Sequence, residues 1–229
     1  MAQAPRLLRI WMPIASAYAL VGERTILVDT GTPGNEERIC SQLERHGVRP
    51  RDVSLILLTH GHLDHFGSAF ALRERTGAPI AIHSSDAGPL RMGHNPPLLP
   101  INATARAMAP FFQKHVTPVE PDLFIDENTE LGEFGAQGRI IATPGHTAGS
   151  VSVLLPSQEL IAGDLLMGGF LGGFVFSGVP GYPYFLDDIE QTHESIRKII
   201  DLDVAQVHVG HGGPLSAAAI RRRFAREIQ

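Results

Sequence analysis

Three histidines and one aspartate lie within a single short segment of this sequence, Thr59-His60-Gly61-His62-Leu63-Asp64-His65. Imidazole nitrogens and carboxylate oxygens are the ligands that bind zinc, iron and manganese in proteins. The His-x-His spacing lets two side chains point at one ion, and Asp64 and His65, which start the following helix, can reach a second ion. The segment therefore predicts a metal site rather than a set of capping or surface histidines.

Three further residues of ligand type each follow a predicted strand and lie beside glycine. His146 follows a Pro-Gly turn, Asp164 follows a glycine, and His211 lies between two glycines. Glycine lets the backbone approach closely at such positions. With the first segment these residues supply seven nitrogen and oxygen ligands, which is too many for one tetrahedral ion. Two ions that share a bridging carboxylate are the economical arrangement.

The elements that must position these residues alternate between strands and helices. The near-continuous apolar run Val53–Leu58 is typical of a strand buried on both faces, and it leads directly into the first ligand segment. We expect an N-terminal hairpin of strands 16–21 and 25–28, and helices over 35–46 and 64–76. Further strands are expected over 79–83, 139–142, 150–155, 159–162 and 204–209, and further helices over 187–200 and 216–228. This alternation implies a layered α/β architecture.

The whole chain, 1–229, is expected to form a single domain, because 229 residues with 43% hydrophobic content can bury one sizeable core. Residues 84–137 are rich in proline and hold one candidate helix, 103–115, so we interpret them as an irregular insertion or lid. The segment 168–185 follows Asp164 and has no regular period. Its aromatic residues could line an apolar substrate pocket, form a homodimer contact or pack as a loop: Phe170, Phe174, Phe176, Tyr182 and Tyr184.

Composition excludes several classes of protein. The formal net charge of −5 argues against a nucleic-acid partner, which requires a basic face. The partner that we expect is a small-molecule substrate. One cysteine excludes an intramolecular disulfide framework and a multi-cysteine metal site. No apolar run approaches the ~20 residues that span a bilayer, so no membrane partner is expected. The run Ile10–Ile14 imitates a secretory signal, but Pro13 interrupts it, and we expect a cytoplasmic protein.

In the order and spacing of its motifs the sequence resembles the metallo-β-lactamase-fold hydrolase superfamily over nearly its whole length. The motifs are Val28-Asp29-Thr30-Gly31, Thr59 to His65, Pro144 to Ser150, Gly163-Asp164 and Gly210-His211-Gly212. The resemblance implies a four-layer αββα sandwich, of α+β or α/β class, with the metals at one edge of the paired sheets. It also implies one ion held by His60, His62 and His146, another held by Asp64, His65 and His211, and Asp164 bridging them. Asp29 matches a residue that orients the ligands in this family.

The resemblance implies hydrolysis by a hydroxide that bridges two divalent ions, with zinc favoured and iron or manganese as alternatives. The hydroxide would attack an ester-like bond, a thioester or a lactone, while Asp64 acts as a catalytic residue that orients the nucleophile or accepts a proton. The motifs look most like the glyoxalase II-like (hydroxyacylglutathione hydrolase-like) branch. That branch has a cationic glutathione-binding side chain where this sequence has Gly173, and the lactonase branch has a tyrosine where it has Met167.

Two other functions stay open at this point. A persulfide dioxygenase-like oxidoreductase of the same superfamily would use a single iron held by His60, His146 and Asp164. A non-catalytic metal-binding protein would keep the ligands without turnover. Metal analysis separates the first alternative from a hydrolase with two ions, and a substrate panel separates the second.

Overall fold

Two β-sheets dominate the computed structural model, which describes residues 4–228. The first sheet has six strands in the order β1-β2-β3-β4-β5-β6. The neighbours from β1 to β3 pair antiparallel, and the neighbours from β3 to β6 pair parallel. The bounds are β1 Arg6–Ile10, β2 Ala17–Val21, β3 Thr25–Val28, β4 Val53–Leu57, β5 Ile80–Ile82 and β6 Leu123–Phe124. The predicted N-terminal hairpin is confirmed as β2 and β3.

The second sheet has five strands in the order β13-β12-β9-β8-β7. β7, β8 and β9 pair antiparallel, whereas β12 lies parallel to β9. The bounds are β7 Arg139–Ala142, β8 Val151–Leu154, β9 Glu159–Ile161, β12 Gln206–His208 and β13 Leu215–Ser216. A separate two-stranded hairpin is made of β10 Met167–Phe170 and β11 Val175–Gly181.

Seven α-helices accompany the sheets within residues 4–228. Their bounds are α1 Glu36–Arg45, α2 Leu63–Phe66, α3 Ala69–Thr76, α4 Ala87–Met92, α5 Ala103–Met108, α6 Ile189–Asp201 and α7 Ala217–Phe224. Short 3₁₀ helices lie at Pro50–Asp52, Ser84–Asp86, Ala109–Phe112 and Leu131–Phe134. None of the helices in this part of the chain is both long enough and apolar enough to cross a bilayer.

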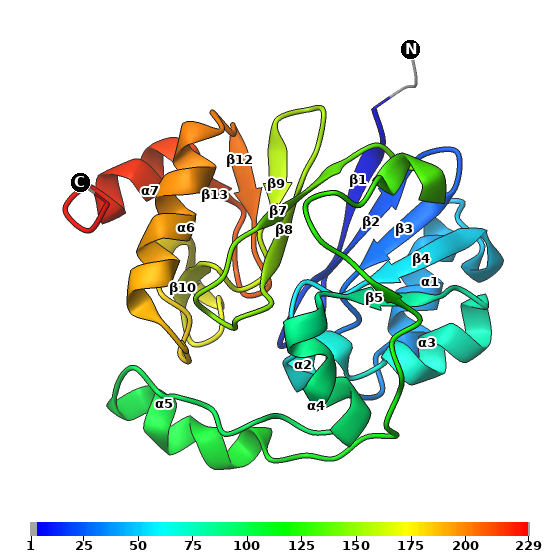
Figure 1. Cartoon of the computed structure of the whole chain (residues 1–229), viewed down its shortest axis with the longest axis horizontal. Helices are drawn as coiled ribbons and strands as arrows, with labels where there is room; N and C mark the ends of the chain where they lie inside the picture. Colours follow the sequence, from blue (N-terminus) through cyan, green and yellow to red (C-terminus); the bar gives the residue numbers. More distant parts are fainter. Residues whose placement is uncertain (1–3, 229) are drawn as a thin grey trace.

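Alternation of side chains along the strands produces four layers. In β3, Leu27 belongs to a core cluster that includes residues of α1 and α3, whereas Ile26 and Val28 belong to the cluster between the two sheets. On the far side of the second sheet, Val207 of β12 packs with Ile196 of α6 in a third cluster. Figure 1 shows the resulting order, with α1 and α3 outside the first sheet and α6 and α7 outside the second. The chain thus forms the αββα sandwich.

The helix expected over 64–76 is wrong as a single element. Gly67 and Ser68 separate α2 from α3. A Cβ atom at Gly67 would collide with Pro33, and the Ser68 hydroxyl accepts a hydrogen bond from the Asn35 N–H at 2.9 Å. These contacts hold the junction against the loop before α1, so two short helices replace one.

Residues 84–137 contain more regular structure than the sequence indicated. α4 joins the first core cluster through Ala87 and Leu90, and β6 extends the first sheet beyond β5. The predicted helix over 103–115 is shorter, because α5 ends at Met108 and a 3₁₀ turn follows to Phe112. Figure 1 shows α5 at the periphery of the molecule, below the two sheets in that view.

The segment 168–185 also differs from the expectation of no regular period, since it holds most of the β10–β11 hairpin. The pairing register shifts between Gly168 and Phe170, and Gly168 and Gly169 have no space for a side chain against the partner strand. Glycine at these positions hides the alternation of polar and apolar residues by which a strand is recognised. The hairpin could therefore not be predicted from the sequence pattern.

Candidate metal centre

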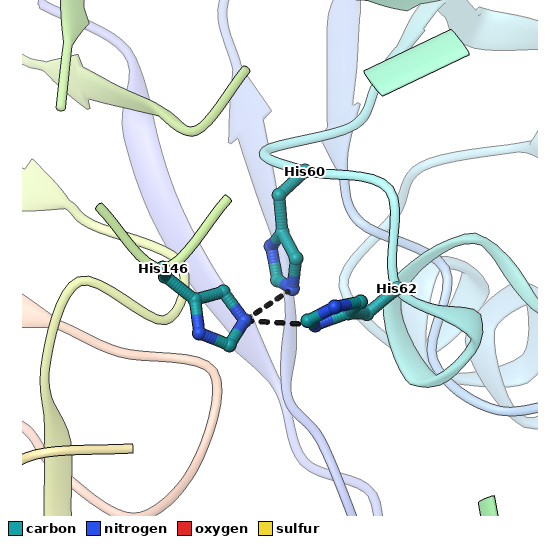
Figure 2. A group of neighbouring side chains, drawn as sticks. All are labelled: His60, His62 and His146. Carbon is teal, nitrogen blue, oxygen red and sulfur yellow. Dashed lines mark hydrogen bonds between the residues drawn. The ribbon is translucent and has the colours of Figure 1, made fainter. Parts of the chain in front are cut away.

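Three imidazole rings converge between the two sheets. His60 and His62 lie on the loop between β4 and α2, and His146 lies on the loop between β7 and β8. The Nε2 atom of His146 is 2.9 Å from Nδ1 of His62 and 3.2 Å from Nε2 of His60, and Figure 2 shows the three rings pointing toward one another. Ligands of one zinc ion at about 2.0–2.1 Å would also lie only a few ångströms apart, so this trio can hold an ion.

A second group lies beside the first. The ligand atoms of Asp64, His65 and His211 all lie within 4.8 Å of one another, and Nε2 of His211 is 3.2 Å from Oδ2 of Asp64. Asp64 and His65 belong to α2, and His211 follows β12. The strand ends of both sheets therefore meet at this group.

Asp164 lies between the two groups, on the loop between β9 and β10. Its Oδ2 atom is 3.0 Å from Nε2 of His211 and 3.8 Å from Nε2 of His146, and its Oδ1 atom is 3.4 Å from Nε2 of His65. The structure thus brings all seven sequence-predicted ligands together. It also places the carboxylate of Asp164 where it faces ligands of both groups.

Hydrogen bonds orient four of the histidine rings. Nδ1 of His146 donates to the Phe185 carbonyl, and Nδ1 of His211 donates to the Ile14 carbonyl, both at 2.8 Å. In the neutral ring, a donor at Nδ1 leaves the lone pair on Nε2, which is the atom that faces the centre. The rings of His60 and His65 are fixed in the same way by a second set of contacts. A metal-binding histidine usually has such a partner for its distal nitrogen.

Asp29 makes the contacts that fix the rings of His60 and His65. Its Oδ2 atom accepts a hydrogen bond from Nδ1 of His65 at 2.8 Å and from the Thr59 hydroxyl at 2.9 Å. Its Oδ1 atom accepts from the Thr59 N–H at 2.8 Å, and the Thr59 oxygen lies 3.0 Å from Nδ1 of His60. One buried carboxylate therefore orients His65 directly and His60 through Thr59.

The histidines of the two ligand groups also differ in protonation state. Burial lowers the pKa of His62 and of His146 to about 4, so both rings are neutral at pH 7 and offer lone pairs. Burial alone would also lower the pKa of His211, but the charge and hydrogen bonds of Asp164, with a hydrogen bond to Asp64, raise it to about 10. In the metal-free protein the two carboxylates thus keep His211 protonated, and the same negative charges would favour a metal cation in place of that proton.

The unpartnered atoms of the site fit bound metal. Among residues 4–228, Nε2 of His65 and Oδ1 of Asp164 are buried side-chain atoms without a hydrogen-bond partner. Leaving such atoms unpaired is costly, and metal coordination is a standard way of satisfying them. The donor set contains imidazole and carboxylate without thiolate, so it suits zinc, iron and manganese.

Asp86, which the sequence motifs did not reveal, joins two ligand loops. Its Oδ2 atom accepts hydrogen bonds from the Gly61 N–H at 2.8 Å and from the Thr147 hydroxyl at 2.6 Å, and its Oδ1 atom accepts from the Gly149 N–H at 2.8 Å. Gly61 lies between His60 and His62, and Thr147 follows His146. The available signal in the sequence is the position of Asp86 just after the strand expected over 79–83.

A cavity of about 200 Å³ opens onto the ligands. His62, Asp64 and Asp164 are among its walls, together with residues of the 84–137 segment. One of these is buried Asn95, which accepts a hydrogen bond from the Leu63 N–H at 2.7 Å and donates to the Phe112 carbonyl at 3.1 Å. The 84–137 segment therefore contributes walls and anchors to the site, and these residues carried no motif.

Two of the five aromatic residues expected in the pocket, Phe174 and Tyr184, line this cavity, and the other three do not. Phe170 and Phe176 project from the β10–β11 hairpin and are 60% and 71% exposed. Tyr182 turns toward α6 and α7, where its hydroxyl lies 2.6 Å from Nε2 of His193 and its ring packs on that of Phe224. The homodimer contact considered for this segment stays a prediction.

Comparisons with known proteins agree with this geometry. The family model described as the metallo-beta-lactamase superfamily matches residues 12–211. A protein of Methanocaldococcus jannaschii named as a probable metallo-hydrolase is 29% identical over 203 residues, which are 86% of this chain and 87% of that protein. A hydroxyacylglutathione hydrolase of Acidiphilium cryptum is 34% identical over 175 residues, which are 76% of this chain but 54% of that enzyme.

Solved structures show the same fold. A metallo-beta-lactamase family protein of Thermus thermophilus matches with a TM-score of 0.68 at 26% identity, over 97% of this chain and 77% of that one. A subclass B3 metallo-beta-lactamase of Bradyrhizobium japonicum matches with a TM-score of 0.66 at 20% identity, over 90% of this chain and 75% of that one. At the latter identity the likeness concerns the fold alone.

Proposed function

Because this chain belongs to the metallo-beta-lactamase superfamily, we propose that it is a metal-dependent hydrolase that cleaves an ester-like bond, either a thioester or a lactone. The observation that carries the proposal is the position of Asp164. Its carboxylate faces ligands of both groups and also lines the cavity. A substrate bond placed in the cavity would therefore lie beside the atoms that would hold the ions.

The proposal assigns separate roles to the metal ligands and to the residues that position them. His60, His62 and His146 would hold one divalent ion, and Asp64, His65 and His211 would hold the other, with Asp164 shared between them. Two such ions would supply a water molecule of lowered pKa and would polarise the carbonyl oxygen of the substrate. The network of Asp29 and the contacts of Asp86 keep the ligand atoms in position while the substrate binds.

Asp64 has a further role in the proposal. Burial alone would raise the pKa of its carboxyl group, but the hydrogen bond from His211 and the charge of His65 hold that pKa below its usual range. The side chain lines the cavity in its ionised form, so its carboxylate can accept a hydrogen bond from the attacking water and orient it, although the lowered pKa makes it a weak base for the proton itself.

A panel of thioesters, lactones and phosphodiesters, assayed with and without a chelator, tests the proposal. We expect hydrolysis of a thioester or a lactone that the chelator abolishes and that His60→Ala removes. His46→Ala provides the control, because His46 is exposed at the end of α1. Absence of chelator-sensitive turnover on every member of the panel would overturn the assignment as a hydrolase of this kind.

A further inference from the structure

The cavity walls away from the ligands are largely apolar, with Asn95 and Tyr184 as polar exceptions. They include Leu98, Met108 and Phe112 from the 84–137 segment, and Leu171 and Phe174 from the β10–β11 hairpin. Leu171 and Phe174 are 63% and 66% exposed, whereas the ligands lie at the buried end of the cavity. Part of the substrate would therefore sit between two apolar walls while its reacting bond faces the ligands.

No lysine or arginine of residues 4–228 lines this cavity. Arg9 lines a neighbouring hollow that shares Ile14 and Phe174 with the cavity, but its guanidinium donates to the Gly212 carbonyl at 2.7 Å and to the Gly213 carbonyl at 3.1 Å. Arg9 thus holds the loop of His211 in place. A carboxylate on the non-reacting part of a substrate would lose its hydration in the cavity without gaining a cationic partner.

Resting on the proposed function, we infer that the substrate carries an uncharged, apolar acyl group and that the walls at 98–112 and 171–174 select for it. An anionic conjugate such as a glutathione thioester fits the cavity poorly, because glutathione adds carboxylates that no side chain of the walls would pair. Apolar surface removed from water favours binding in proportion to its area. Longer acyl chains should therefore be better substrates until the cavity is filled.

A series of thioesters tests this inference directly. The acetyl, butyryl, hexanoyl and octanoyl thioesters of N-acetylcysteamine, an uncharged thiol, would be compared with the glutathione thioesters of the same acids. We expect kcat/KM to rise by about fourfold for each added methylene group until the cavity is full, and to be lower for each glutathione thioester than for its uncharged counterpart. A flat series, or a preference for the glutathione thioesters, would overturn the inference.

Two phenylalanines of one hairpin provide matched variants. Phe174 lines the cavity and Phe176 does not, although both are largely exposed. We expect Phe174→Ser to flatten the dependence on chain length and Phe176→Ser to leave it unchanged. Equal effects of the two substitutions would contradict a selective wall.

A binding measurement separates this inference from the proposed function. Non-hydrolysable thioethers, in which a methylene group replaces the carbonyl, would be titrated into the metal-loaded protein by calorimetry. Affinity that increases with chain length, with a negative change in heat capacity, supports the apolar site even where no thioester is hydrolysed. Chain-length-dependent binding without hydrolysis would refute the proposed function but not the apolar site. Hydrolysis that does not depend on the acyl chain would refute the selectivity but not the proposed function.

Discussion

Oδ2 of Asp86 lies 2.8 Å from the backbone nitrogen of Gly61, and this hydrogen bond joins the 84–137 segment to the loop that carries His60 and His62. The same carboxylate also accepts hydrogen bonds from the loop after His146. All three ligands of the first group therefore lie on loops that one buried side chain holds together.

Replacing Asp86 by alanine should weaken metal binding about 10-fold to 100-fold, as removal of a group that orients metal ligands commonly does. The change leaves three donors without their acceptor, so the free energy of unfolding should also fall, by about 3 kcal/mol or more. Zinc affinity and chemical denaturation measure the two effects. Asp126→Ala is the control, because Asp126 accepts a backbone hydrogen bond within an exposed turn of the same segment. Equal zinc affinities in the two variants would contradict the role of Asp86.

The ligands could be predicted from the sequence, but their supports largely could not. Each ligand lies in a short motif after a strand, where a few neighbouring residues carry the signal. The contacts of Asp86 join residues 25 and 63 positions away, and no local pattern records such a pairing. Asp29 is the exception, because it lies within a recognisable motif of its own.

Most of the fold could be predicted because local sequence patterns also carry the signal for its strands and helices. Buried strands such as β4 are continuous apolar runs, and amphipathic helices such as α6 repeat their apolar residues at helical spacing. The β10–β11 hairpin has neither signal, because its glycines interrupt the alternation and because Phe170 and Phe176 face away from the core. The pocket walls at Leu98 and Met108 depend on the tertiary position of the 84–137 segment, which local patterns do not determine.

Removing the Asp29 carboxylate should affect both groups of ligands. Asp29→Ala leaves Nδ1 of His65 and the hydroxyl of Thr59 without their acceptor, so both His65 and His60 lose a fixed orientation. We expect about 10-fold to 100-fold weaker binding of each ion and a comparable loss of kcat/KM. Competition with a chromophoric chelator measures both steps of zinc binding. A variant that binds both ions with unchanged affinity would show that Asp29 does not orient the ligands.

Gly210 leaves room for two ligands. A Cβ atom at this position would collide with Oδ1 of Asp164 and with the ring of His65, so Gly210→Ala should displace one of them and lower the bound metal. Gly178→Ala is the matched control, because a Cβ atom there meets open space at a backbone angle that alanine adopts. Metal content and hydrolysis rate should fall in the first variant and stay near wild type in the second. A fully loaded, active Gly210→Ala variant would contradict this packing.

Metal binding should release protons at pH 7. In the metal-free protein the pKa of His211 is raised to about 10 and that of His65 lies well above its usual value, so both rings are protonated and compete with the ion. The apparent affinity should therefore rise with pH, by about tenfold per pH unit for each proton released. Calorimetric titration in two buffers of different ionisation enthalpy counts the protons, and His211→Gln should release one fewer. Affinity that does not change between about pH 6 and pH 9 would refute this linkage.

The metal content of the reconstituted protein tests the central claim most directly. After the metal has been removed with a chelator and zinc has been added back, the excess is dialysed away and the bound metal is measured by mass spectrometry. The positions of the two ligand groups and of Asp164 predict two zinc ions per chain in the wild type and a marked loss of both in Asp164→Ala. Wild-type protein that retains a single ion, or an Asp164→Ala variant that retains two, would contradict the shared centre.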